Sequence, residues 1–203
     1  SSAADLVFAK INAGNLVIQI VAGGANGDRQ LSAAQKTITI PTGGFSALLD
    51  DFSIAALDWN GDGQDELVVV GKPNAPLPAE SVDLARIAGY VFDGETLRAN
   101  STPITQTSAA FAIQTDATSR AAMLTAGGWT PVRVSSNLTA VVVGDVNQDG
   151  YEDLMLADSR YAQYSDGDPL PGTEADESFG RTYLVLGRAQ MPSGNQPVLE
   201  GSV

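Results

Sequence analysis

Two segments of the chain repeat the same order of an apolar run, an acidic loop and a second apolar run. Residues 54–71 read IAALDWNGDGQDELVVVG, and residues 140–157 read AVVVGDVNQDGYEDLMLA. Aligning Asp58 with Asp145 gives an offset of 87 residues. Half of this offset is about 43 residues, the usual length of one four-stranded propeller blade. We therefore expect four sheet modules, of which the second and the fourth carry the acidic loops.

Short β-rich runs separated by Gly, Asn, Asp and Pro make up most of the chain. Many short strands favour a sandwich or a propeller over an α/β fold. The expected fold class is all-β, a β-propeller-like array of short antiparallel sheets in a single domain or fragment spanning residues 1–203. One helix is predicted at Ala79–Ile87. The predicted strands are Asp5–Lys10, Asn15–Ala22, Thr37–Ile40, Phe52–Leu57, Leu67–Gly71, Gly89–Phe92, Ala109–Gln114, Val132–Val134, Leu138–Val143, Leu154–Ala157 and Arg181–Leu186.

The residue types that the chain lacks exclude several kinds of chemistry. It has no Cys, which excludes disulfides, thiolate nucleophiles and Cys-based zinc or iron–sulfur sites. It has no His, which excludes Ser–His and Cys–His nucleophilic pairs and HExxH zinc sites. The best-placed carboxylates lie in the two acidic loops, and no spare pair suggests a general acid and a general base. The sequence therefore favours a protein that is not an enzyme.

The chain is strongly acidic, with 24 Asp and Glu residues against 11 Lys and Arg residues and a net charge of −13. Such a charge repels nucleic-acid phosphates and anionic membranes, so neither is an expected partner. No run reaches the roughly 18 apolar residues that a membrane helix needs. Surplus carboxylate is typical of calcium-binding or halotolerant extracellular proteins, although a solvated surface gives the same composition.

Both acidic loops follow the pattern DxNxDGxx[DE], with side-chain oxygens at positions 1, 3, 5 and 9. Calcium binds six to eight oxygen ligands in a flexible shell, and Gly at position 6 allows the sharp turn that such a loop needs. A backbone carbonyl at position 7 completes the set. Two calcium sites are predicted. Their ligands are Asp58, Asn60, Asp62, the Gln64 carbonyl and Glu66 in the first loop, and Asp145, Asn147, Asp149, the Tyr151 carbonyl and Asp153 in the second.

The loops differ from the helical kind of calcium-binding loop, and ordinary tight turns are the alternative to calcium binding. An EF-hand would place a carboxylate at position 12 and continue into a helix, but position 12 is Val69 in one loop and Leu156 in the other, and apolar strands follow. Asp-Gly and Asn-Gly also form ordinary tight turns. Two such loops that both carry an acid at position 9 favour calcium. Trp59, inside the first loop, is interpreted as a packed structural aromatic in preference to a glycan-stacking platform.

The order of apolar strand, DxNxDGxx[DE]L, apolar strand and Gly-aromatic strand resembles the FG-GAP repeat of integrin α-subunit propellers and the related VCBS repeats of secreted bacterial proteins. The third strands are GYVFDG from Gly89 and GRTYLVLG from Gly180, and the resemblance covers about residues 50–98 and 136–190. It implies a calcium-stabilised β-propeller, either complete or part of a longer array with further blades or domains. Glu66 stands where the family usually has Asp, a departure that weakens or reshapes the first site.

The resemblance implies a secreted or cell-surface location and a non-enzymatic role in adhesion, through binding of an extracellular protein or glycan. The alternative is an accessory or catalytic propeller of a secreted polysaccharide-degrading enzyme, a lyase or hydrolase, because such repeats occur in lyases. Turnover of a glycan by this chain alone would favour the alternative.

Overall fold

The fold is described from a computed structural model. The residues that it describes are 5–21, 23, 36–41, 52–71, 87–99, 103–114, 138–158, 181–191 and 194–197. Within these ranges the chain forms strands almost throughout, with one α-helix, α1 (Gly94–Ala99), and one short 3-10 helix, η3 (Gln106–Ser108). The predicted all-β class is therefore confirmed. No helix in this part of the chain is long and apolar enough to cross a membrane.

The described strands form three sheets. The first sheet has the order β1-β2-β3-β7, the second β12-β8-β6-β5-β4 and the third β11-β10-β9. Neighbouring strands are antiparallel except in the pairs β3–β7 and β8–β12. The bounds are β1 (Leu6–Asn12), β2 (Asn15–Val21), β3 (Lys36–Pro41), β4 (Phe52–Leu57), β5 (Glu66–Gly71), β6 (Ile87–Phe92), β7 (Ile104–Thr105), β8 (Phe111–Gln114), β9 (Leu138–Gly144), β10 (Asp153–Asp158), β11 (Arg181–Val185) and β12 (Gly194–Pro197).

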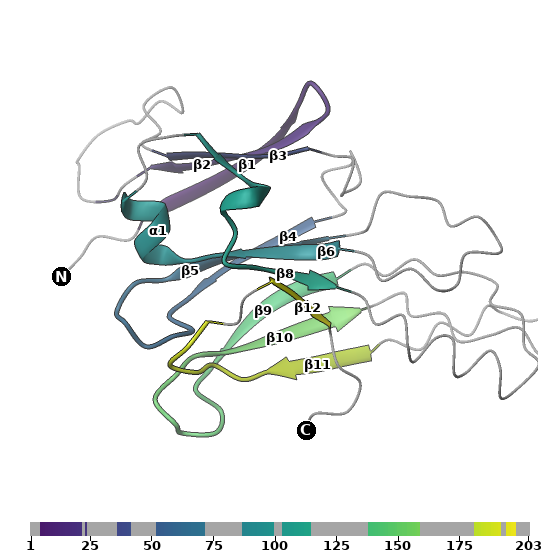
Figure 1. Ribbon diagram of the computed structural model, residues 1–203. Coiled ribbons are helices and arrows are strands. Elements are labelled where there is room, and N and C mark those ends of the chain that lie inside the picture. Colours follow the sequence, from purple (N-terminus) through teal and green to yellow (C-terminus); the bar gives the residue numbers. More distant parts are fainter. Residues whose placement is uncertain are drawn as a thin grey trace, which may run out of the picture.

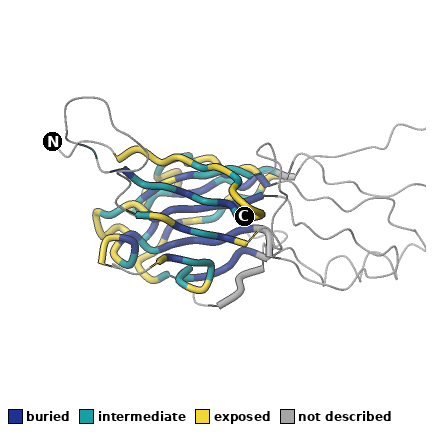
Figure 2. Tube along the Cα trace, turned by 90° about the horizontal axis from the view of Figure 1, so that it is seen from above, coloured by how far each residue is buried: buried dark blue, intermediate teal, exposed yellow. Residues whose placement is uncertain are grey.

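The second sheet lies between the other two and has an apolar cluster on each face (Figure 1). Side chains alternate between the two faces of a strand, and β5 illustrates this. Leu67 and Val69 pack toward the first sheet, whereas Val68 and Val70 pack toward the third. Every residue of β5 is buried, which explains why this strand is a continuous apolar run after Glu66. Most of the buried residues lie within the strands, whereas the loops at the strand ends are largely exposed (Figure 2).

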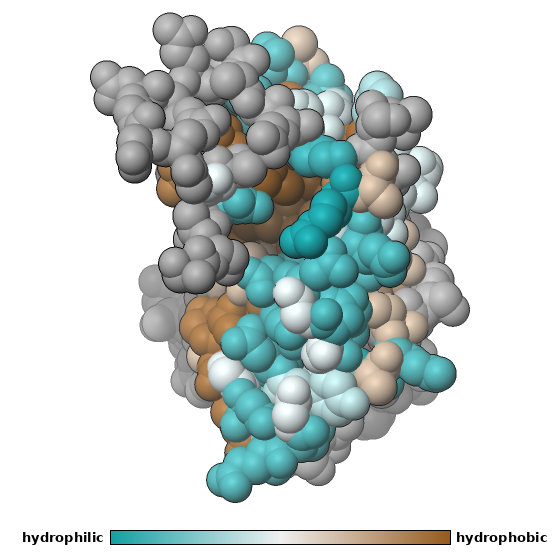
Figure 3. Space-filling view, turned by 90° about the vertical axis from the view of Figure 1, so that its left-hand side faces the viewer, coloured by the Kyte–Doolittle hydropathy of each residue, from teal (hydrophilic) through white to brown (hydrophobic). Residues whose placement is uncertain are grey.

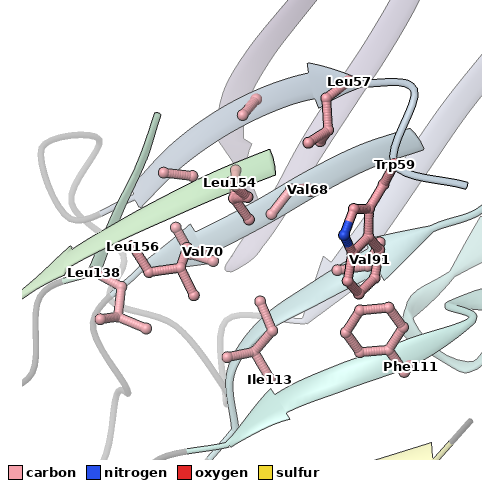
Figure 4. Packing of buried hydrophobic residues seen from close by; sticks show 12 residues of the cluster. Leu57, Trp59, Val68, Val70, Val91, Phe111, Ile113, Leu138, Leu154 and Leu156 are labelled. Atoms are coloured by element: carbon pink, nitrogen blue, oxygen red, sulfur yellow. The ribbon is translucent and has the colours of Figure 1, made fainter. Parts of the chain in front are cut away.

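The cluster between the second and third sheets joins residues that are far apart in the sequence. Trp59 and Phe111 form its aromatic part, with ring centroids 5.1 Å apart (Figure 4). Leu154 and Leu156 of β10 complete the contact from the third sheet. Burial of each such side chain stabilises the fold by about 1.5–3 kcal/mol. Packing between the sheets thus fixes the end of β4, where the first acidic loop begins, and the start of β10, where the second acidic loop ends.

Most predicted strands agree with the structure to within two residues, but several expectations need correction. The expected third module, between the two loop-bearing ones, does not form a separate sheet among the described residues, because β8 joins the sheet of β4, β5 and β6. Ile87, the last residue of the predicted helix Ala79–Ile87, belongs to β6, and the rest of that segment lies outside the described residues. The predicted strand Val132–Val134 also lies outside them. Neither α1 nor β7 nor β12 was predicted.

Candidate metal centre

Both acidic loops lie at the same end of the sheet stack, where β4 turns into β5 and β9 turns into β10 (Figure 1). The space-filling view of this end shows a mainly hydrophilic surface over the loops (Figure 3). β4–β5 and β9–β10 are antiparallel neighbours, so each loop closes a hairpin. Because the hairpins belong to stacked sheets, the two loops are brought side by side.

The first loop is folded around its own acidic side chains. The Asp58 carboxylate accepts a hydrogen bond from the backbone N–H of Gly63 at 3.0 Å. Asn60 accepts one from the backbone N–H of Asp62 at 2.9 Å, and Asp62 accepts one from Gln64 at 2.8 Å. The side-chain amide of Asn60 donates to Asp62 at 3.1 Å. Positions 1, 3 and 5 of the motif therefore turn their oxygens toward the inside of the loop.

Glu66, at position 9, is completely buried at the start of β5. Its carboxylate accepts backbone N–H groups from Trp59 at 2.9 Å, Asn60 at 3.2 Å and Gly94 at 3.3 Å. Burial nevertheless raises the pKa of Glu66 from 4.5 to about 7, and the nearby Asp62 charge also raises this pKa, whereas the three backbone hydrogen bonds lower it. A cation beside this carboxylate would offset the cost of burying its charge.

The second loop repeats most of the hydrogen bonds of the first. The Asp145 carboxylate accepts the N–H of Gly150 at 2.8 Å, and Asp149 accepts that of Tyr151 at 3.0 Å. Asp153, which is also fully buried, accepts the N–H groups of Val146 and Gly187, each at 2.8 Å. Gly187 follows the third strand of its sheet as Gly94 follows β6. The internal repeat inferred from the sequence thus extends to individual atoms.

Left-handed backbone conformations make the sharp turns of both loops possible. The Gly at position 6 has a φ of +82° in Gly63 and +94° in Gly150, as the motif predicts. Position 4 is left-handed as well, with Gly61 at +73° and Gln148 at +61°. A side chain at this conformation carries a steric cost that Gly avoids, so the second loop holds Gln148 against a local preference.

The first loop gathers one carboxylate that the sequence did not indicate. Among the described residues, Asp62, Glu66 and Asp93 form the one group of three acidic side chains that each offer a carboxylate oxygen within 4.8 Å of the other two. Asp93 lies just after β6, and its carboxylate also accepts the N–H of Thr96 at the start of α1 at 2.8 Å. In the second repeat the residue that corresponds to Asp93 is Leu186, which precedes Gly187 as Asp93 precedes Gly94. The second loop therefore lacks the equivalent carboxylate.

Two oxygens of the first loop are buried without a hydrogen-bond partner. They are Oδ1 of Asp58, a predicted ligand side chain, and the side-chain Oε1 of Gln64, whose backbone carbonyl is the predicted ligand. Buried polar atoms normally have a partner, because an unsatisfied one costs about 1–3 kcal/mol. Oxygen-only donors of this kind suit calcium. The first loop therefore combines oxygen-only donors with two unsatisfied buried oxygens, a set that could hold a metal ion such as calcium.

Two of the residues that join the two loops, Glu152 and Arg188, were not singled out from the sequence. The backbone N–H of Asp58 donates to the Glu152 carboxylate at 2.9 Å, and the N–H of Glu152 donates to the Asp58 carbonyl at 3.3 Å. Trp59 is buried with 4% of its surface exposed, and its carbonyl accepts the N–H of Arg188 at 3.0 Å. This burial places Trp59 in the core, so it is not an exposed stacking platform.

No protein-family model matches the chain, and a search of curated proteins finds no match either. The resemblance to FG-GAP and VCBS repeats therefore stays a prediction from the sequence.

Proposed function

We propose that the two acidic loops bind calcium ions with a structural role. The observation that carries the proposal is the pair of buried, unpartnered oxygens of Asp58 and Gln64 in a loop that also holds the fully buried Glu66. When bound, calcium would neutralise the clustered carboxylates and hold the turn between β4 and β5. Two like charges 4 Å apart repel by about 4 kcal/mol at an effective dielectric of 20, so the loop benefits from a counter-charge.

The first loop is proposed as the tighter of the two sites, in contrast to the expectation that Glu66 at position 9 weakens it. It would use the predicted ligands Asp58, Asn60, Asp62, Gln64 and Glu66, with Asp93 supplying an additional carboxylate nearby. The second loop would use Asp145, Asn147, Asp149, Tyr151 and Asp153. Its Asp and Asn residues up to position 5 are exposed, so water competes there for the ion.

The stacked sheets, with both loops at one end, support the further proposal of a propeller-like array. In this proposal the chain is an extracellular, non-enzymatic module that presents loops to a protein or a glycan. The acidic charge of −13 and the lack of His support a binding role over local catalysis. The loops and the sheet stack together support the proposed binding role. The proposed class of ligand, a protein or a glycan, comes from the resemblance.

The proposal is tested by thermal unfolding of the full chain in EGTA, in millimolar calcium and in millimolar magnesium. We expect calcium to raise the melting temperature clearly above that in EGTA, and magnesium to raise it much less, because a loop crowded with protein ligands leaves little room for the waters that magnesium retains. Equal melting temperatures in calcium and EGTA would reject a structural calcium. A parallel assay with soluble polysaccharides tests the binding role: retention without cleavage supports it, and turnover contradicts it.

A further inference from the structure

The two loops are joined through backbone that carries the predicted ligands of both. Glu152 lies between Tyr151 and Asp153 in the second loop, and it exchanges two hydrogen bonds with Asp58, the first ligand position of the other loop. The first of these bonds, from the Asp58 N–H to the Glu152 carboxylate, is charge-assisted and partly buried. A shift of either loop therefore moves a ligand-bearing peptide of the other.

A second connection runs beside the first. The Trp59 carbonyl accepts the N–H of Arg188, and the preceding residue, Gly187, donates its N–H to Asp153 at 2.8 Å. The Arg188 guanidinium also lies 5.7 Å from the centre of the Trp59 ring. Trp59 stands between the ligand positions Asp58 and Asn60, and its own N–H donates to Glu66 at 2.9 Å. The buried acids Glu66 and Asp153 are thus connected through the backbone of Trp59 and of Gly187–Arg188.

The residue of the first loop that corresponds to Glu152 makes no such contact with the second loop among the described residues. Asp65 occupies in the first loop the position that Glu152 occupies in the second, 87 residues later. Asp65 is exposed, and none of the side-chain hydrogen bonds found among the described residues joins it to the second loop. Glu152 is therefore the specific link, and Asp65 is a matched residue of the same charge at the same repeat position.

We propose that the two loops bind calcium cooperatively and that Glu152 is the positioning residue that couples them. This inference rests on the proposed calcium binding. An ion in the second loop orders the segment from Tyr151 to Asp153 and with it the Glu152 carboxylate. The Asp58 peptide is then held in place before the first loop binds its own ion, so the second binding event loses less conformational entropy. By linkage the same factor applies in the reverse order.

The test is a thermodynamic cycle on the full chain by isothermal titration calorimetry with calcium chloride. The overall two-ion binding constant of the unmodified chain is divided by the product of two single-site constants. One constant comes from Asp149→Ala, which disables the second loop, and the other from Asp62→Ala, which disables the first. We expect this coupling factor to be roughly 5 or more, within the usual range of coupled sites.

The same cycle is then repeated in three backgrounds. Glu152→Ala should bring the coupling factor to about 1, and Glu152→Gln, which keeps an acceptor for the Asp58 N–H, should restore most of it. Asp65→Ala removes a charge at the matched position and should leave the factor unchanged. Melting curves in EGTA confirm that each variant is folded.

The outcomes separate this inference from the proposed function. Two bound ions with a coupling factor near 1 in the unmodified chain would overturn the coupling and leave calcium binding intact. Equal losses in Glu152→Ala and Asp65→Ala would also overturn it, because the effect would then be one of charge and not of the contact. No calcium bound to the unmodified chain would overturn both proposals.

Discussion

The backbone N–H of Gly187 donates a hydrogen bond to the carboxylate of Asp153 at 2.8 Å, 34 residues away in the sequence. The same relationship joins Gly94 to Glu66 at 3.3 Å. In both places a glycine after the third strand of a sheet lies directly against the end of an acidic loop. A Cβ at Gly187 would lie 2.5 Å from the Glu152 carbonyl oxygen, and one at Gly94 would lie 2.6 Å from that of Asp65.

Substitution of either close-packed glycine should destabilise the fold. Gly187→Ala and Gly94→Ala should each lower the free energy of unfolding by about 3 kcal/mol, because the neighbouring backbone must move and the hydrogen bond to the buried acid is weakened. Urea titration measures this change. Gly63→Ala is the control: its Cβ would meet nothing within 4 Å, and only its φ of +82° opposes the substitution, at a cost of about 1–2 kcal/mol. Equal losses in all three variants would contradict the close-packing argument.

The pKa of Glu66 gives a pH dependence that can be measured in EGTA. Because burial raises this pKa from 4.5 to about 7, the native state holds a proton that the unfolded chain has released between these values. The contribution of Glu66 to stability is therefore fully present below pH 4.5 and is lost as the pH rises through 7. Each pKa unit corresponds to 1.36 kcal/mol, so the loss amounts to about 3 kcal/mol.

Glu66→Gln isolates this effect, since Gln cannot titrate. We expect the free energy of unfolding of wild type to fall relative to that of Glu66→Gln between pH 4.5 and pH 7.5 in EGTA. Saturating calcium should remove the fall, because the ion stabilises the charged carboxylate. A difference between the two proteins that stays constant across this range would contradict the assignment.

The positions of most strands were predictable from the sequence, whereas the pairing of the strands into sheets was not. β5 and β10 were located to within one residue, because apolar runs after an acidic loop are distinctive. β12 (Gly194–Pro197) was missed, because the letters GNQP carry no strand preference and the strand exists through its pairing with β8. α1 has six residues, too few to show a helical period, and Asp93 caps it.

The candidate site was predictable to the extent that it is local in sequence. The motif gave the inward-turned oxygens of Asp58, Asn60 and Asp62 and the turn at Gly63. Asp93 could not be found in this way, because only the pairing of β5 with β6 brings it beside Glu66. Glu152 was missed for the same reason, since its role depends on the stacking of two sheets.

Asp149 should affect stability both with and without calcium. Its carboxylate accepts the N–H of Tyr151 at 3.0 Å, so Asp149→Ala should cost about 1 kcal/mol in EGTA. In millimolar calcium the loss should be larger, because the variant also loses ligand binding to the native state. Chemical unfolding in the two buffers measures both values. A loss of equal size in the two buffers would show that Asp149 acts only as a turn residue.

A pair of leucines on neighbouring strands tests the layered packing. Leu156 of β10 is 1% exposed against the second sheet, whereas Leu184 of β11 is 39% exposed. Leu156→Ala should lower the free energy of unfolding by about 2–5 kcal/mol, and Leu184→Ala by less than about 1 kcal/mol. Similar losses in both variants would mean that the third sheet does not pack on the second through this face.

The central claim, that these loops are calcium sites, is tested most directly by counting the ions that one chain binds. Equilibrium dialysis of the full chain against calcium, with bound metal measured by mass spectrometry, should give two ions per chain for wild type. It should give one each for Asp62→Ala and Asp149→Ala at a calcium concentration that saturates the remaining loop. A wild-type chain that binds no calcium at millimolar concentration would contradict the account.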